Sequence, residues 1–350
     1  DIAEIIGYHV VSNNNSREID FTNPRKIGIP IKVFSKNRRL LVDDGYTLVM
    51  VAQTTLPPNV ERKVVAIYSA STTIDDCISD SNFLASIYID IHSAPENQKR
   101  FFVGFSAIDV STGKNFVHSI ESTIKDTKLW LDEVYRLLHN YNPTEVLIHC
   151  EDSVEADLTE WCHLWSLDKD KIHYNLYKGK EFKKPSYQNE YYGKIFTDTG
   201  MNTATEYIGL ENSPQMLVSH IYMLEFIHEH KMENIREIQK PVLNEPSNHL
   251  VLSHNCMYQL YIIDTKEHSS EKYSSLLSLL NKCKTAVGRR LCKERLLYPI
   301  VDTDTLNKRY QILEEFRRLE LYSQCLPFLS KINDIERYFR KMGLGILEPD

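Results

Sequence analysis

Residues 101–114 read FFVGFSAIDVSTGK, and this stretch decides how the middle of the chain folds. Its apolar, aromatic start predicts a buried strand over Phe101–Val110, because such residues pack well on a pleated surface. The following Ser111–Lys114 segment is typical of a hairpin turn. A phosphate-binding loop is excluded, since it needs a glycine and a hydroxyl residue where this chain has Ile108 and Asn115.

Further strands and a helix flank this stretch. Apolar runs predict strands at Phe83–Ile91 and Glu145–Cys150, and the spacing of apolar residues over Lys128–Tyr141 predicts an amphipathic helix. Pro143 cannot continue that helix and marks its end. Strand, hairpin, strand, helix and strand in this order predict an α/β domain over residues 76–190.

The first 75 residues have a mixed pattern of their own. A short helix is predicted at Ile2–Ile6, a polar loop at Asn13–Ser16, and a strand at Thr47–Ala52, directly after Gly45 and Tyr46. We therefore predict a separate α/β domain over residues 1–75.

The last part of the chain is predicted to be helical. After an irregular stretch at residues 184–214, apolar residues recur with a period of 3.6 around 216–227, 276–291 and 306–316. We place a domain boundary near residue 190 and predict an all-α domain over residues 191–350.

The composition is that of a chain that buries apolar cores. The 350 residues are 42% hydrophobic and 25% charged, which excludes a disordered or fibrous protein. The seven cysteines are odd in number and include no CxxC pair, so we expect reduced thiols in an intracellular protein. No apolar run approaches the roughly 20 residues of a membrane-spanning helix, so we expect no membrane partner.

Two adjacent pairs of His and Cys are the nearest approach to a metal-binding sequence. His149-Cys150 and Cys162-His163 each place both ligands side by side, whereas the paired ligands of structural zinc sites are usually spaced further apart. We predict no metal site, and we assign no catalytic residue to this chain.

Positive charge is concentrated locally, although the net charge is −7. Residues 25–39 contain no acidic side chain and six basic ones, which are Arg25, Lys26, Lys32, Lys36, Arg38 and Arg39. Such a cluster can bind DNA through counterion release, but a solvated helix face explains the charge equally well. A second basic cluster, at residues 282–295, is interpreted as the solvated side of a helix whose Val287 and Leu291 face a core.

Carboxylates near the predicted strands leave a nuclease as an alternative. Asp90, Asp109 and the Asp75-Asp76 pair could in principle hold two magnesium ions at strand ends. However, Asp109 precedes Ser-Thr-Gly and is also an ordinary turn residue. A magnesium-dependent nuclease of RNase H-like fold therefore remains a second hypothesis.

Several motifs in the first domain follow one another in a familiar order. They are Arg25-Lys26-Ile27-Gly28-Ile29-Pro30, a strand that follows Gly45 and ends at Gln53, and Val60-Glu61-Arg62-Lys63-Val64-Val65. Their order and spacing resemble the mismatch-recognition domain of the MutS family of DNA mismatch repair proteins. The chain departs from the family at Ala52, where Glu is usual. Gly28 is expected to permit a tight turn, and Pro30 to fix the start of the next helix.

The resemblance extends to later motifs. Phe105–Gly113 and Asn142–Leu147 resemble the connector domain of MutS, which has an RNase H-like α/β fold without nuclease activity. A long helical signature that includes Gly288, Arg290, Leu291 and Pro299 resembles the MutS core, which continues into the lever. Arg295 stands where the family usually has Trp.

The resemblance implies a function and a set of partners. It implies a multidomain, non-enzymatic piece of a longer protein that binds mismatched double-stranded DNA. The side chains expected to contact the DNA backbone are Lys32, Lys36, Arg38, Arg39 and Arg25. The full-length parent is expected to bind ATP and Mg²⁺ in an ATPase domain beyond Asp350, to form a homo- or heterodimer, and to dock downstream repair proteins on the connector. A MutS-like scaffold for branched DNA, without mismatch reading, is a further alternative.

Overall fold

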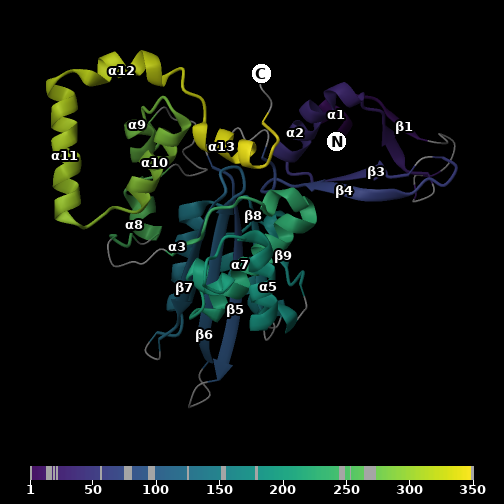
Figure 1. Cartoon of the computed structure of the whole chain (residues 1–350), viewed down its shortest axis with the longest axis horizontal. Helices are drawn as coiled ribbons and strands as arrows, with labels where there is room; N and C mark the ends of the chain where they lie inside the picture. Colours follow the sequence, from purple (N-terminus) through teal and green to yellow (C-terminus); the bar gives the residue numbers. More distant parts are fainter. Residues whose placement is uncertain are drawn as a thin grey trace.

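A mixed β-sheet forms the centre of the molecule (Figure 1). The computed structural model describes residues 2–12, 18, 20, 23–55, 57–74, 81–93, 99–123, 126–150, 155–177, 180–243, 249–252, 254–263 and 273–347. The predicted loop at Asn13–Ser16 and the Asp75-Asp76 pair lie outside these residues. Within them, no helix is both long and apolar enough to cross a membrane.

The central sheet has six strands in the order β10-β7-β6-β5-β8-β9. The strands are β5 (Phe83–Ser93), β6 (Lys99–Asp109), β7 (Lys114–Glu121), β8 (Glu145–Cys150), β9 (Ile172–Tyr174) and β10 (Val242–Leu243). β5, β6 and β7 form an antiparallel meander, while β8 runs parallel to β5 and β9 runs parallel to β8. The strands and the hairpin turn predicted for this region are confirmed.

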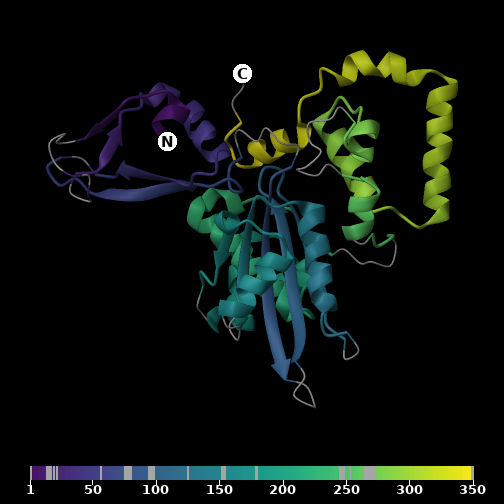
Figure 2. The same cartoon turned by 180° about the vertical axis from the view of Figure 1, so that it is seen from behind.

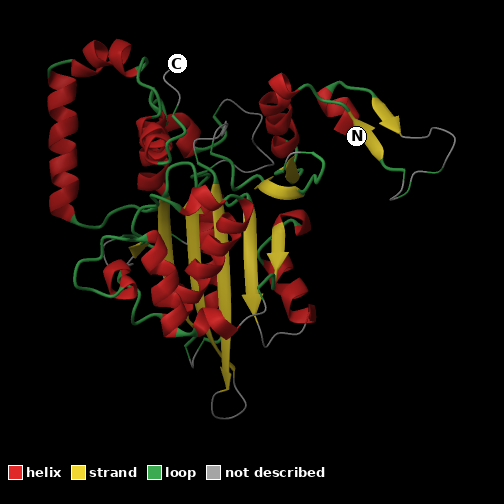
Figure 3. Cartoon of the chain, turned by 45° about the vertical axis from the view of Figure 1, so that its right-hand side comes forward, coloured by secondary structure: helices red, strands yellow, loops and turns green. Residues whose placement is uncertain are grey.

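Helices cover both faces of this sheet (Figure 3). On one face lie α3 (Leu129–Tyr141) and α4 (Glu155–Leu164), where all three tryptophans of the chain join one apolar core. On the other face lie α5 (Pro185–Ile195), α6 (Ala204–Ile208) and α7 (Pro214–His230), whose apolar residues form a second core. The 3-10 turns η3 (Lys169–Lys171), η4 (Lys180–Lys183) and η5 (Met232–Ile235) connect these elements.

Gly104 in the middle of β6 allows α7 to approach the sheet this closely. A Cβ atom at this position would overlap the backbone carbonyl of Gln215, in the first turn of α7. Further along the same helix, the Ser219 hydroxyl donates to the carbonyl of Ser86 on β5 at 2.8 Å. The backbones of helix and sheet therefore touch at a point where only glycine fits.

Residues 185–243 thus pack mainly with the sheet, and Asn234 and Arg236 within this range also accept hydrogen bonds from Arg340 of α13. α7 crosses the face of the sheet that is turned toward the viewer in Figure 1, and β10 adds an edge strand parallel to β7. The boundary predicted near residue 190 falls inside this packed unit, within α5. A helix that covers a sheet has the same 3.6-residue period as a helix in a bundle, so the sequence pattern could not separate the two.

The first part of the chain forms a smaller unit beside the sheet (Figure 2). It contains α1 (Ile2–Ile6), β1 (Val10–Ser12), β2 (Arg25–Ile27), η1 (Ile31–Val33), α2 (Phe34–Asp43), β3 (Leu48–Gln53) and β4 (Arg62–Tyr68). β1 pairs with β2 and β3 pairs with β4, both antiparallel. This confirms the short helix and the strand predicted here.

The last part is helical, as predicted. Its helices are α8 (His254–Gln259), α9 (Leu276–Leu280), α10 (Ala286–Leu297), α11 (Thr303–Arg318), α12 (Leu321–Leu329) and α13 (Ile335–Gly343). The helix predicted around 276–291 is two helices, because Ser275 caps α9 and Thr285 caps a new start at α10. α11 and α12 form an arm that stands away from the sheet, while α13 returns to the end of the sheet (Figures 1 and 2).

Replacing Gly104 by Ala should lower the free energy of unfolding of the central unit by about 3 kcal/mol, because the added Cβ pushes α7 off the sheet. All three tryptophans lie in this unit, so urea unfolding followed by tryptophan fluorescence measures it selectively. Gly28→Ala is the matched control, since a Cβ there meets no atom within 4 Å. Equal unfolding midpoints for the two variants would contradict the packing argument.

Candidate nucleic-acid interface

Five basic side chains of the 25–39 cluster are exposed: Lys26, Arg39 and three on successive elements of the first unit. Arg25 lies at the start of β2, Lys32 in η1, and Lys36 near the start of α2. Pro30, with a φ of −62°, directly precedes η1 and sets its start, as expected. Because residues 25–39 contain no acidic residue, these three side chains form a site that attracts phosphate.

The other two arginines of the cluster, Arg38 and Arg39, make contacts within the first unit. Arg38 is only 8% exposed, and its guanidinium lies 4.6 Å from the centre of the Tyr68 ring, so it holds α2 against β4. This burial disfavours the predicted contact of Arg38 with the DNA backbone. Arg39 is exposed but lies 3.8 Å from the carboxylate of Asp43, one turn further along α2.

Two of the motif residues in this unit have clear structural roles. Gly45 ends α2 with a φ of +92°, a left-handed conformation that side chains disfavour. Gln53 ends β3 and donates to the carbonyl of Thr55 at 2.8 Å. The role predicted for Gly28 is wrong, because its φ is not left-handed and a Cβ would meet open space.

Sequence reasoning missed two further cations. Arg62 and Lys63 lie exposed on β4, in the same unit as the 25–39 cluster, and Lys63 is 3.5 Å from Glu61. The two cations are adjacent in the Glu61-Arg62-Lys63 sequence, but the preceding glutamate lowers the net charge of this segment.

A buried carboxylate joins the first unit to the sheet. Glu145, at the start of β8, accepts hydrogen bonds from the Ser69 hydroxyl at 2.7 Å, the Ser71 amide at 2.9 Å, and His173 at 3.0 Å. The Ser71 hydroxyl also donates to it. Burial alone would raise the pKa of Glu145, but these donors outweigh burial and lower the pKa to about 2. We call these four residues the Glu145 joint.

A second polar cluster joins the helices to the hairpin turn of the sheet. Arg290 of α10 donates to both oxygens of Asp334 at 2.6 and 2.7 Å, and to Glu336 at 2.6 and 2.9 Å. Glu336 also accepts from the ammonium of Lys114, at the start of β7, at 2.6 Å. Burial raises the pKa of Glu336, but the hydrogen bonds from Lys114 and Arg290 leave it below its ordinary value.

Two arginines of α13 also hold the helices against the hairpin turn of the sheet. Arg337 donates to the hydroxyl of Ser111 at 3.0 Å. Arg340, which is 4% exposed, donates to the backbone carbonyls of Val110 and Arg236, and to that of Asn234 at 2.6 Å. Burial lowers the pKa of Arg340 to about 10, so it remains charged near neutral pH. We use the name hairpin joint for residues 109–114, Arg290 and residues 334–340.

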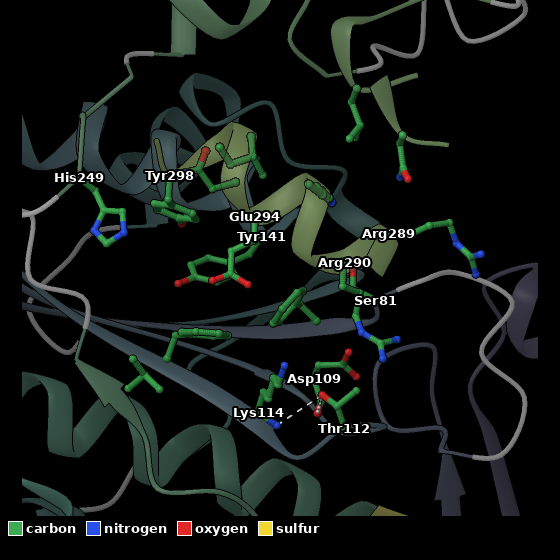
Figure 4. Close-up of a pocket in the computed structure, with 18 residues that line it drawn as sticks. Ser81, Asp109, Thr112, Lys114, Tyr141, His249, Arg289, Arg290, Glu294 and Tyr298 are labelled. Carbon is green, nitrogen blue, oxygen red and sulfur yellow. Dashed lines mark hydrogen bonds between the residues drawn. The ribbon is translucent and has the colours of Figure 1, made fainter. Parts of the chain in front are cut away.

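A cavity of about 300 Å³ lies beside the hairpin joint (Figure 4). In this view Arg290 reaches from α10 toward the turn that carries Asp109 and Thr112, whereas Arg289 points away. The side chains of Tyr141 and Tyr298 line the cavity. Its lining comes from the sheet, α3 and α10, so the cavity lies between α10 and the sheet.

The motif residues of the helical signature divide into two groups. A Cβ on Gly288 would lie 2.9 Å from the capping hydroxyl of Thr285, and the Pro299 carbonyl accepts the Leu250 amide at 2.7 Å, so both serve the local fold. Leu291 is 41% exposed, so the expectation that it faces a core is wrong within the described residues. The second basic cluster is not simply a solvated face, because Arg290 holds the hairpin joint.

The nuclease hypothesis fails on strand register. Asp109 pairs across the hairpin with Phe83, at the start of β5, whereas Asp90 lies seven residues further along β5. At about 3.3 Å per residue the two carboxylates are about 23 Å apart, too far to share a pair of metal ions. Asp109 instead accepts from the amide and hydroxyl of Ser111, and burial raises its pKa.

Cys150 and Cys162 of the two His and Cys pairs join one apolar core, whereas His149 faces α7 on the other side of the sheet. His149 is buried and stacks on Tyr222, with ring centres 3.9 Å apart. Burial lowers the pKa of His149 to about 3. Among the described residues, no group of three or more His, Cys, Asp or Glu could hold a metal ion.

Comparison with known proteins identifies the class. Residues 255–350 match the family model of MutS domain III. The chain is 29% identical, over 93% of its length, to a protein of Acanthamoeba polyphaga mimivirus that is named as a mutS homolog of DNA mismatch repair. It is 26% identical, over 88% of its length, to the DNA mismatch repair protein MutS of Caldanaerobacter subterraneus, and 26% identical, over 84%, to a mitochondrial mutS homolog of Sarcophyton glaucum.

These relatives are all named as DNA mismatch repair proteins. Over most of its length the chain is similar to proteins of the MutS family. It covers 31%, 33% and 32% of the lengths of the three relatives, respectively.

The Glu145 joint predicts a pH dependence of stability. Glu145 stays ionised in the folded state down to about pH 2, whereas its ordinary pKa is 4.5. Its stabilisation, about 3 kcal/mol, is therefore fully present above pH 4.5 and is lost as the pH falls from 4.5 toward 2. Urea midpoints from tryptophan fluorescence should differ strongly between the native chain and Glu145→Gln at pH 7, and should converge only as the pH approaches 2. Parallel midpoint curves would show that the carboxylate does not hold the joint.

The hairpin joint predicts an unequal response to two arginine substitutions. Arg290→Ala leaves two half-buried carboxylates without their main donor and should lower the stability of the helical part by about 2 kcal/mol. Arg318→Ala, which removes an exposed pair with Glu315, should cost less than about 0.5 kcal/mol. Urea unfolding followed by far-ultraviolet circular dichroism measures both. Similar losses in the two variants would rule out a special role for Arg290.

Proposed function

We propose that this chain binds duplex DNA as part of a MutS-type mismatch repair protein, with the contact on its first unit. One observation carries this proposal: Arg25, Lys32 and Lys36 are exposed on neighbouring elements in a stretch without acidic residues. Each phosphate that such a side chain neutralises releases counterions, which favours binding at low salt. Similarity to proteins of the MutS family supports DNA mismatches as the target.

We assign the three parts of the chain by their resemblance to MutS domains. Residues 1–75 are the mismatch-recognition domain, and the sheet with its helices is the RNase H-like connector. The helices from α8 onward are the core and lever, which is consistent with the domain III match over residues 255–350. The packing of α5–α7 on the sheet favours a connector that reaches about residue 243.

The activity of the complete protein is part of the same proposal. Binding of ATP and Mg²⁺ belongs to an ATPase domain that these 350 residues do not include, and the present chain is non-enzymatic. The complete protein acts as a homo- or heterodimer, and other repair proteins dock on the connector. The names of the relatives support mismatch repair for this family.

The two joints provide a physical route through the chain. The Glu145 joint ties the segment after β4 to the start of β8, and the hairpin joint ties the β6–β7 turn, at the same end of the sheet, to α10 and α13. A change in the position of the first unit on DNA therefore reaches the helices through hydrogen-bonded side chains on one rigid sheet.

Removing the exposed cations should weaken DNA binding without regard to sequence. In Arg25→Ala/Lys32→Ala/Lys36→Ala, affinity should fall equally for matched and mismatched duplexes, and the slope of log K against log salt should become shallower by about 2 to 3. Fluorescence anisotropy with labelled duplexes at several salt concentrations measures both quantities.

The matched control is Lys169→Ala/Lys171→Ala/Lys194→Ala, which removes the same charge from the surface of the sheet unit. Its salt slope should equal that of the native chain. If both triple variants lower the slope equally, net charge and not the first unit determines binding.

A scaffold for branched DNA is the alternative function. The same anisotropy experiment with a mismatched duplex, a matched duplex and a four-way junction separates the two. Tighter binding of the mismatch supports mismatch recognition, whereas preference for the junction supports the scaffold.

A further inference from the structure

Two cysteines face each other at the start of α10. Cys283 is exposed in the connection between α9 and α10, and Cys292 is partly buried on α10 itself. The Cβ and Sγ atoms of Cys283 lie 3.2 and 3.5 Å from the place that a Cβ on Gly288 would occupy. The Cys283 side chain therefore lies over the first turn of α10, where glycine leaves room for it.

The helix repeat brings the second thiol to the same place. Residues four apart lie on one face of a helix, so Cys292 is one turn beyond Gly288 on the face that Cys283 covers. The two thiols are close enough for Cys283 to raise the pKa of Cys292. Proximity of this kind is what disulfide formation requires, since the two Cβ atoms must come within about 4.5 Å.

We propose that Cys283 and Cys292 form a redox-responsive dithiol, which a hydroperoxide converts into an intramolecular disulfide. This modification site is independent of the DNA contact on the first unit.

The two thiols have different roles in the reaction. Burial, and then the nearby Cys283, raise the pKa of Cys292, while Arg295 lowers it. The exposed Cys283 therefore reacts first. Its thiolate attacks one peroxide oxygen, the O–O bond breaks, and Cys283 becomes a sulfenic acid while the other oxygen leaves as hydroxide or alkoxide.

The second step closes the disulfide. The Cys292 thiolate attacks the sulfenic sulfur, the S–O bond breaks, and hydroxide leaves and takes up a proton to form water. The two sulfurs together lose two electrons, which reduce the hydroperoxide to water or to water and an alcohol. A low-molecular-weight thiol reverses the bond by exchange.

The disulfide would act on the start of α10. It would link Cys283, before the Thr285 cap, to Cys292 in the middle of the helix. The loop that it closes would contain Arg289 and Arg290. Because Arg290 holds the hairpin joint, oxidation would fix the helix that carries this arginine.

Peptide mapping provides a direct test on the full chain. Cleavage after Glu271 and Glu294 releases residues 272–294, which contain both cysteines and no other. The chain is treated with hydrogen peroxide, blocked with N-ethylmaleimide and analysed by mass spectrometry without reductant. We expect this peptide to lose two hydrogen atoms and to bind no maleimide, and to bind two after reduction.

Variants decide whether the pairing is specific. Cys283→Ser should abolish the linked peptide, whereas Cys325→Ser, a partly exposed cysteine on α12, should leave its yield unchanged. Gly288→Ala should slow linkage in the folded chain, because the new Cβ takes the space beside Cys283. Stepwise oxidation of Cys283 to sulfinic acid without linkage, or equal rates of linkage in native and urea-unfolded chain, would overturn the proposal.

Discussion

The carboxylate of Glu336 is the contact on which the arrangement of the parts depends. It accepts from Lys114 of the sheet and from Arg290 of α10, while it belongs to α13 itself, so one side chain joins three elements. Beside it, Tyr298 after α10 lies near Tyr141 of α3, with ring centres 6.4 Å apart. Charge-assisted hydrogen bonds are stronger than those between neutral groups, so Glu336 contributes strongly to the position of the helices relative to the sheet.

The sheet can serve as a rigid base for these contacts because both of its faces are filled. Gly104 lets α7 touch the backbone of β6, and the aromatic core under α3 and α4 fills the opposite face. Glu145 and the hairpin turn then place polar groups at two positions on the sheet. One connects to the first unit and the other to the helices, so the sheet lies between these two parts.

Much of the fold could be predicted from local sequence, since strand alternation, the hairpin turn and helix caps depend on neighbouring residues. The exposed part of the basic cluster was predicted for the same reason. The partners of Arg38 and Arg290 could not be, because Tyr68 and Asp334 lie 30 and 44 residues away and only the tertiary fold brings them together. The separation of Asp90 from Asp109 depends on strand register, which composition does not reveal.

Hydrogen–deuterium exchange of the chain with and without a saturating mismatched duplex tests the central claim, that DNA contact reaches the helices through both joints. The account predicts slower exchange at residues 25–39 together with altered exchange at residues 69–74 and 334–340. In an Arg290→Ala chain the change at residues 334–340 should disappear, while that at residues 25–39 remains. A change confined to the first unit in the native chain would contradict the account.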